Sequence, residues 1–179
     1  SAMEAKLCAR QEVALVGAGN SAGQAAVFLA PHVERVHVLV RGDGLAETMS
    51  KYLIERLAAT PNVTIHPRTE VTELHGDEQR GLSAIGWHCR DTGADERCDI
   101  RHLFLFIGAD PETDWLAGCG IGLDARGFVL TGAGSDALET SVPGVFAVGD
   151  VRSGSVKRVG SAIGEGAAVV AQIHRHLAS

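Results

Sequence analysis

Residues 12–22 of the chain read EVALVGAGNSA, a short apolar run that leads into the pattern G-x-G-x-x-A. Such a run predicts a buried parallel strand, and the glycines after it predict a tight turn into a helix. In that context the first glycine permits the turn, the second lets a pyrophosphate approach the backbone, and the small third residue lets the helix pack on the strand. The positive end of the helix dipole then favours phosphate. We therefore expect a dinucleotide to bind at Gly17, Gly19, Asn20, Ser21 and Ala22.

Strands and helices alternate through the residues that follow. Helical periodicity predicts helices over 21–30 and about 46–59, each ended by a proline. Apolar runs predict further parallel strands at 36–40, 62–66 and 102–107, and alternating residues from 69 to 101 predict a small antiparallel β-meander. The pattern therefore predicts an α/β fold, a Rossmann-like three-layer nucleotide-binding domain with a parallel sheet and this meander.

The composition shifts towards glycine, aspartate and serine beyond about residue 115. A strand is expected within 144–150, and a last helix over about 157–177. A second G-x-G-x-x-A at 132–137 is expected to be a loop, because Pro143 follows too soon for a crossover helix. One strand and one helix leave their apolar faces exposed. Either they pack on the first domain or the rest of their domain lies outside this chain.

Composition excludes several classes of function. The 179 residues carry 22 acidic and 16 basic side chains, a formal charge of −6, and no basic stripe that would bind nucleic acid. No apolar run approaches the roughly 20 residues of a membrane span, and the first residues lack the apolar centre of a signal peptide. The four cysteines show neither C-x-x-C nor a metal-ligand spacing, and no hydrolase motif is present. We expect a cytoplasmic protein without a metal site, whose chemistry comes from cofactors.

The end of the second strand should decide which dinucleotide binds. An NAD site places Asp or Glu about 20 residues after the glycines, where the carboxylate binds the ribose 2′-hydroxyl. Here the strand ends in Arg41, whose guanidinium would pair with a 2′-phosphate, and Lys51 would assist from the next helix. This arrangement favours NADP(H). The alternative is that Arg41 is a solvated loop residue and that Asp43 binds the ribose.

Four motifs together resemble the thioredoxin reductase-like flavoproteins, which are pyridine nucleotide-disulfide oxidoreductases. They are GAGNSAGQ at 17–24, VRGDG at 40–44, FIGADP at 106–111 and VPGVFAVGDV at 142–151. The resemblance covers nearly the whole chain in order. It implies that residues 1–125 form the NAD(P)H-binding domain, with Gly108 at the nucleotide site. It implies that residues 126–179 are the C-terminal part of a FAD-binding domain, whose first part would lie upstream.

The resemblance also implies cofactor roles in this second part. Gly149 and Asp150 would meet the ribityl and pyrophosphate chain of FAD, and Lys157, Arg158 and Val159 would lie against the flavin ring. The implied activity is hydride transfer from NADPH to FAD, and then to a disulfide, a thioredoxin-like protein or another acceptor, in a full-length homodimer. No catalytic residue is assigned to this chain, which alone is expected to be inactive.

The sequence departs from the family's pattern in two places. The redox-active C-x-x-C that precedes the nucleotide-binding strand would end near Met3, where no cysteine stands, and Cys8 alone cannot cycle between dithiol and disulfide. Gly42 and Ala46 stand where the family has further arginines, which weakens the preference for NADP(H).

Two other interpretations of the chain's function remain open. One is a non-catalytic NAD(P)-binding regulatory module, and the other is a helical segment, 145–177, that mediates dimer contacts.

Overall fold

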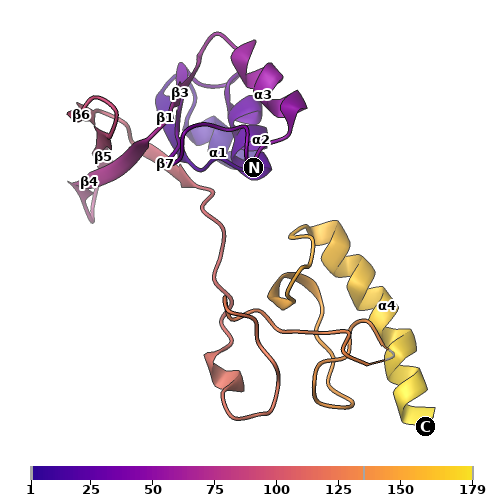
Figure 1. Ribbon diagram of the computed structural model, residues 1–179. Coiled ribbons are helices and arrows are strands. Elements are labelled where there is room, and N and C mark those ends of the chain that lie inside the picture. The colour runs from indigo at the N-terminus through magenta and orange to yellow at the C-terminus, as the bar shows by residue number, and fades with distance from the viewer. Residues whose placement is uncertain (1, 135, 179) are drawn as a thin grey trace. The chain divides into compact units, whose positions relative to one another are not determined.

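The computed structural model describes residues 2–134 and 136–178, and the chain divides into two compact units between Gly108 and Ala109 (Figure 1). The boundary expected from the sequence, between residues 125 and 126, lies within the second unit. Backbone hydrogen bonds explain the difference, because they join the residues on both sides of that boundary. The Asp124 N–H donates to the Phe128 carbonyl at 2.8 Å across a short turn.

Four parallel strands form the central sheet of the first unit. They are β1 (Glu12–Val16), β2 (Arg35–Leu39), β3 (Val63–His66) and β7 (His102–Leu105), in the spatial order β3-β2-β1-β7. Val13 pairs with Val36 on one side and with His102 on the other. β1 and β2 are apolar along most of their length because both faces of the sheet are covered.

Three helices cover one face of this sheet: α1 (Ala2–Leu7), α2 (Asn20–Leu29) and α3 (Lys51–Ala58). Alternate strand residues point towards them, so that Val13 and Val38 share a buried cluster with Ala26 and Leu57. The sequence carries no periodic signal for α1, since six residues make fewer than two turns. α1 therefore depends on its packing against the sheet.

α3 begins at Lys51, later than the predicted start at 46. The residues before it form a turn that is tied to the loop after β1. The Thr48 hydroxyl donates to the Ala18 carbonyl at 2.8 Å, and the Asn20 carboxamide oxygen accepts the Ser50 N–H at 2.7 Å. These side-chain bonds compete with helical hydrogen bonds, which accounts for the delayed helix start.

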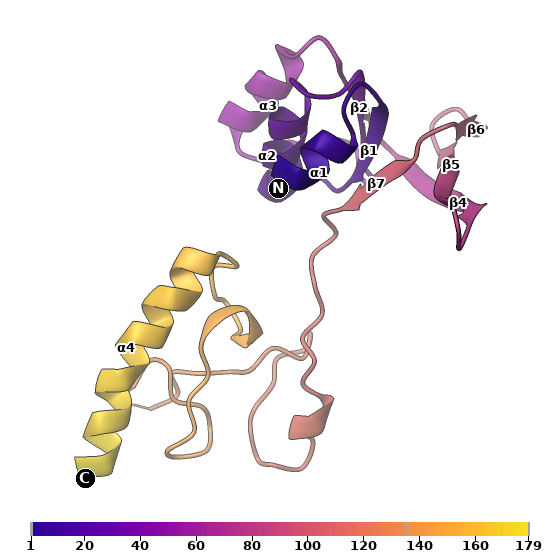
Figure 2. The same ribbon diagram turned by 180° about the vertical axis from the view of Figure 1, so that it is seen from behind.

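The meander covers the opposite face of the sheet. It consists of β4 (Thr69–Asp77), β5 (Gly81–Cys89) and β6 (Ala94–Cys98), antiparallel and in that spatial order. Ile85 and Trp87 are buried with Ala14 and Leu39 of the central sheet. Figure 2 shows the helices and the meander on opposite sides of the sheet. The three-layer α/β arrangement predicted from the sequence is confirmed.

A pair of histidines lies between the central sheet and the meander. His37 Nδ1 is 3.0 Å from His66 Nε2, and His37 Nε2 is 3.1 Å from a carboxylate oxygen of Glu12. Both rings also contact Trp87, at centroid distances of 5.4 and 5.2 Å. Burial and then the neighbouring His37 lower the pKa of His66, and the Glu96 carboxylate acts in the opposite direction.

We expect the first unit to lose stability as the pH falls below the ordinary histidine pKa of about 6.5. The pKa of His66 is lower in the folded chain than in the unfolded chain, so the unfolded chain binds the proton first as the pH falls. The stabilisation is therefore complete above that pH and declines below it. His66→Gln should flatten the pH dependence of thermal unfolding, followed by Trp87 fluorescence in a Trp115→Phe background, whereas His32→Gln at an exposed ring should not. An unchanged dependence in His66→Gln contradicts this role.

The second unit contains α4 (Val159–Ala178) and two 3₁₀ turns, Asp114–Leu116 and Gly149–Val151. The strand predicted within 144–150 is wrong for the described residues, where a single β-bridge pairs Glu139 with Phe146. A strand needs a neighbouring strand to take up its backbone hydrogen bonds, and one bridge does not make a ladder. The described residues of 132–137 are non-helical, as expected, and residue 135 lies outside the described residues.

An apolar stripe runs along α4. Its large members are exposed, and they are Val159, Ile163, Val170, Ile173 and Leu177. On another side of the helix Gln172 is buried, and its carboxamide oxygen accepts the Leu138 N–H at 3.0 Å. Within the described part of the chain, no helix is long and apolar enough to cross a bilayer.

Candidate functional site

The turn after β1 requires glycine at position 17. Gly17 has a φ of +145°, and its N–H donates to the Leu39 carbonyl at 3.1 Å. A Cβ atom here would lie 2.6 Å from the Phe106 carbonyl oxygen. β1, β2 and the end of β7 therefore meet at this residue, and a side chain would separate them.

The next residues of the fingerprint open onto free space. Gly19 precedes α2 with no side chain capping the helix, and no atom lies within 4 Å of the place where its Cβ would be. The first turn of α2 contains no acidic residue. Ala22, in the first turn of α2, is fully buried, as the small third position of the fingerprint requires, and Ser21 is exposed. The turn therefore leaves room for an anion at the helix N-terminus.

A cavity of about 920 Å³ adjoins the fingerprint turn. Its walls come from the carboxyl ends of β1, β2 and β7 and from the start of β4, and Gly17, Gly19, Arg41 and Gly108 of the predicted set line it. This is the edge of a parallel sheet at which α/β proteins bind ligands. One wall is apolar and open to solvent, since Leu74, Leu105 and Ile107 are 61–70% exposed.

Arg41 and Asp43 differ in what they contact. Asp43 accepts a hydrogen bond from Arg68 Nε at 2.7 Å, whereas in the described residues no ion pair or hydrogen bond engages the Arg41 guanidinium. Arg41 is exposed and lines the cavity. The cavity therefore presents a cation at the end of β2, and the neighbouring carboxylate is already paired.

Lys51 and Asn20 lie outside this cavity. The Lys51 side chain is 90% exposed, lies 3.8 Å from Glu55, and does not contribute to the cavity wall.

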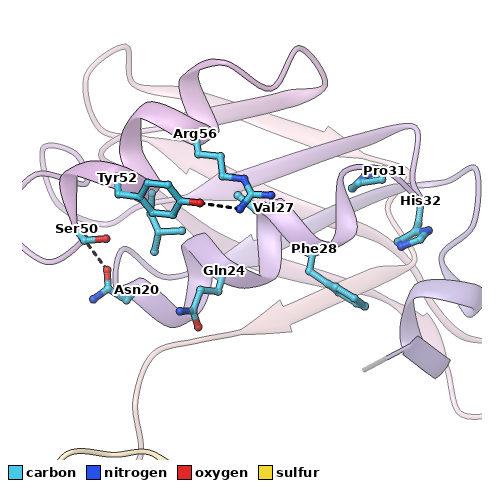
Figure 3. Close-up of a pocket in the computed structure, with 10 residues that line it drawn as sticks. Asn20, Gln24, Val27, Phe28, Pro31, His32, Ser50, Tyr52 and Arg56 are labelled. Carbon is cyan, nitrogen blue, oxygen red and sulfur yellow. Dashed lines mark hydrogen bonds between the residues drawn. The ribbon is translucent and has the colours of Figure 1, made fainter.

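Asn20 lines a second hollow of about 580 Å³ between α2 and α3, where its carboxamide faces Ser50 (Figure 3). In the same hollow Arg56 Nη1 donates to the Tyr52 hydroxyl at 3.0 Å. The side chain of Asn20 thus joins the fingerprint loop to the turn before α3.

Sequence reasoning missed several residues of the cavity. Glu47 and Thr48 lie in the turn before α3, and Thr69 and Glu70 lie at the start of β4. A signal existed for the first two, since the segment after a parallel strand lies at the ligand-binding edge. The other two reach the cavity through the packing of the meander on the sheet.

The candidate flavin-binding residues of the second unit surround one turn. Gly149 has a φ of +75°, and its N–H donates to Glu165 at 2.7 Å. Arg152 also pairs with Glu165, and these two contacts lower the pKa of the Glu165 carboxyl. Lys157 Nζ donates to the Asp150 carbonyl at 2.5 Å, and Asp150 is exposed. Arg158 and Val159 follow at the start of α4, and both are exposed.

Known proteins resemble this chain over most of its length. Residues 2–166 match the family model described as pyridine nucleotide-disulphide oxidoreductase. The chain is 34% identical over 169 residues to NADPH-dependent thioredoxin reductase 3 of Arabidopsis thaliana, covering 94% of this chain and 31% of that protein. It is 32% identical over 163 residues to the thioredoxin reductase of Mycoplasma pneumoniae, covering 91% of this chain and 50% of that protein.

A solved structure shows the same fold. The thioredoxin reductase of T. acidophilum superposes with a TM-score of 0.82 and 25% sequence identity, over 99% of this chain and 56% of that one. The chain thus spans between about a third and about half of the length of the two curated relatives, and about half of the solved structure.

Proposed function

Because this chain belongs to the pyridine nucleotide-disulphide oxidoreductases, we propose that its first unit is the NADPH-binding portion of a flavin-dependent oxidoreductase. The observation that carries this proposal is the cavity in which the fingerprint turn and the Arg41 side chain line the same space. Gly17 and Gly19 let the pyrophosphate approach the backbone, and Arg41 pairs with the 2′-phosphate. The pairing of Asp43 with Arg68 supports this assignment over ribose binding by Asp43.

The remaining walls of the cavity fit a dinucleotide. Gly108 lines the cavity together with the fingerprint turn and Arg41. The apolar wall at Leu105 and Ile107 offers a surface for a nicotinamide ring. A nicotinamide dinucleotide bound there supplies a hydride for a flavin. The residues of this chain bind and orient the dinucleotide.

We include in the proposal a FAD-binding role for the second unit. The exposed Asp150 carboxylate fits a partner that offers hydroxyl groups, such as a ribityl chain, because a carboxylate only accepts hydrogen bonds and a hydroxyl group can donate one. Arg152 and Glu165 fix the backbone of the Gly149 turn. Lys157, Arg158 and Val159 then stand next to that turn, where the proposal places the flavin ring.

The acceptor in the complete protein is proposed to be a disulfide, a thioredoxin-like protein or another oxidant. The names of the two relatives, both thioredoxin reductases, support this class of acceptors. Cys8 does not support a dithiol within this chain, because it is buried and burial raises the pKa of its thiol. The electrons are therefore proposed to leave through groups outside this chain, which alone is inactive.

We also propose that the complete protein is a homodimer in the cytoplasm. The four cysteines, Cys8, Cys89, Cys98 and Cys119, are free thiols, which suits a reducing compartment. The exposed apolar stripe of α4 supports a contact that the complete protein would cover.

A fluorescence titration of the 179-residue chain with NADPH and, in parallel, with NADH tests the proposed function. We expect saturable binding of both nucleotides with a lower Kd for NADPH, because Arg41 pairs only with the 2′-phosphate. Equal affinities for NADPH and NADH would contradict the recognition of the 2′-phosphate by Arg41. The absence of binding for both would contradict the assignment of the cavity to a dinucleotide.

A further inference from the structure

We propose that Arg68 is a positioning residue that sets the preference for a 2′-phosphorylated dinucleotide by fixing the turn at residues 41–44. This inference rests on the proposed function, because it concerns how Arg41 is presented to the cavity. Arg68 lies between β3 and β4 and does not itself line the cavity. Its effect on the ligand is therefore exerted through the turn.

The side chain of Arg68 bridges two turns that are distant in sequence. Its Nε donates to Asp43 at 2.7 Å, and its Nη1 donates to Asp91 at 2.8 Å. Asp43 lies in the turn after β2, and Asp91 lies in the turn between β5 and β6. A guanidinium can hold two carboxylates at once because its N–H groups form a rigid planar fork.

The backbone of Arg68 holds the same turn. Its N–H donates to the Gly42 carbonyl at 2.9 Å, and its own carbonyl accepts the Arg90 N–H at 2.9 Å. Arg68 adopts a φ of +48°, which is uncommon for a residue with a side chain. This conformation allows the backbone and the side chain of one residue to reach the turn together.

Arg90 adds a second tie to the Arg41 backbone. Its Nη2 donates to the Arg41 carbonyl, and its Nε lies 3.6 Å from Glu70. The turn has few packing restraints, because no atom lies within 4 Å of a Cβ built at Gly42 or Gly44. Polar contacts from Arg68 and Arg90 therefore hold the backbone position from which the Arg41 side chain extends.

Arg68 also pairs with the carboxylate nearest in sequence to Arg41, while the carboxylates of Glu47 and Glu70 belong to the cavity wall itself. Asp43 stands two residues from Arg41, and in the described part of the chain Arg68 is the cation that pairs with it. An unpaired carboxylate there repels a 2′-phosphate and competes with it for Arg41, whereas it does not repel a ribose hydroxyl. Loss of Arg68 should therefore weaken NADPH binding and leave NADH binding nearly unchanged.

The test compares Kd values for NADPH and NADH in Arg68→Ala, Arg68→Lys and the double variant Arg68→Ala/Asp43→Asn. We expect Arg68→Ala to raise the Kd for NADPH about tenfold and the Kd for NADH less than about threefold. The double variant should regain part of the NADPH affinity, because the unpaired charge is gone. Arg35→Ala is the matched control, since this arginine pairs with Glu12 and lies outside the cavity.

Hydrogen exchange of the amides at 41–44 supplies a readout that needs no ligand. We expect faster exchange there in Arg68→Ala than in Arg35→Ala. Equal losses for the two nucleotides, or an unchanged Kd ratio in both Arg68 variants, would overturn the positioning role. If Arg68→Ala does not fold, Arg68→Lys decides, because a lysine ammonium cannot reproduce the fork between two carboxylates.

The same data separate this inference from the proposed function. If the unmodified chain shows no preference for NADPH, the proposed role of Arg41 fails and the role of Arg68 fails with it. If the preference exists and Arg41→Ala removes it while both Arg68 variants keep it, only the role of Arg68 is overturned.

Discussion

Gly17→Ala is expected to abolish dinucleotide binding and to destabilise the first unit by about 3 kcal/mol. The added Cβ would lie 2.6 Å from the Phe106 carbonyl oxygen and 3.1 Å from the carbonyl carbon. The backbone at φ +145° also disfavours any residue with a side chain. Relief of this clash requires β1 and the end of β7 to move apart, and the cavity lies at that junction.

Gly19→Ala is the matched control for the stability part of this prediction. Gly19 has an ordinary φ of −84°, and nothing lies within 4 Å of its Cβ position, so thermal stability should be unchanged. Its methyl group would still occupy the space where the pyrophosphate approaches, so the affinity for NADPH and NADH should fall together. If Gly17→Ala unfolds at the same temperature as the unmodified chain, the close approach to Phe106 has no energetic role.

Arg41→Ala is expected to raise the Kd for NADPH by about 10- to 100-fold and to leave NADH binding nearly unchanged. The guanidinium lines the cavity and has no partner among the described residues, so the substitution removes a charge-assisted contact with the 2′-phosphate and exposes no buried group. Parallel titrations with the two nucleotides measure this difference. Equal losses for both would contradict the role of Arg41.

Lys51→Ala provides a comparison at a residue with the same charge. The sequence predicts that Lys51 assists in phosphate binding, but its side chain is exposed beside Glu55 and outside the cavity. From this geometry we expect less than about a twofold change in the Kd for NADPH, because the Lys51 side chain does not line the cavity. A loss as large as that of Arg41→Ala would support the role predicted from the sequence.

Local sequence patterns were sufficient for the elements whose signals are contiguous. The run at 12–16 and the glycines after it predict β1, the turn and α2, because valine packing and glycine conformations are properties of those residues themselves. The alternation over 69–101 likewise predicts the meander. The strand expected within 144–150 is not formed. A strand also requires a neighbouring strand, and among the described residues this segment has only one bridge, between Glu139 and Phe146.

The direction of individual side chains in the site could not be predicted in the same way. Asn20 belongs to the fingerprint, yet it faces Ser50, because the turn before α3 packs against the loop after β1. The pairing of Asp43 with Arg68 depends on the position of the β4 start relative to β2, which is set by tertiary packing. Sequence alone left Arg41 and Asp43 as alternatives for this reason.

Backbone amide chemical shifts of the ¹⁵N-labelled chain, recorded during titration with NADPH, test the central claim most directly. The first unit offers a hollow at the fingerprint turn and another between α2 and α3, and the shifts identify which of them binds the nucleotide. We expect the largest changes at Gly17, Gly19, Arg41 and Gly108. Changes centred on Phe28 and Arg56 instead, or no changes in either hollow, would contradict the assignment of the dinucleotide site.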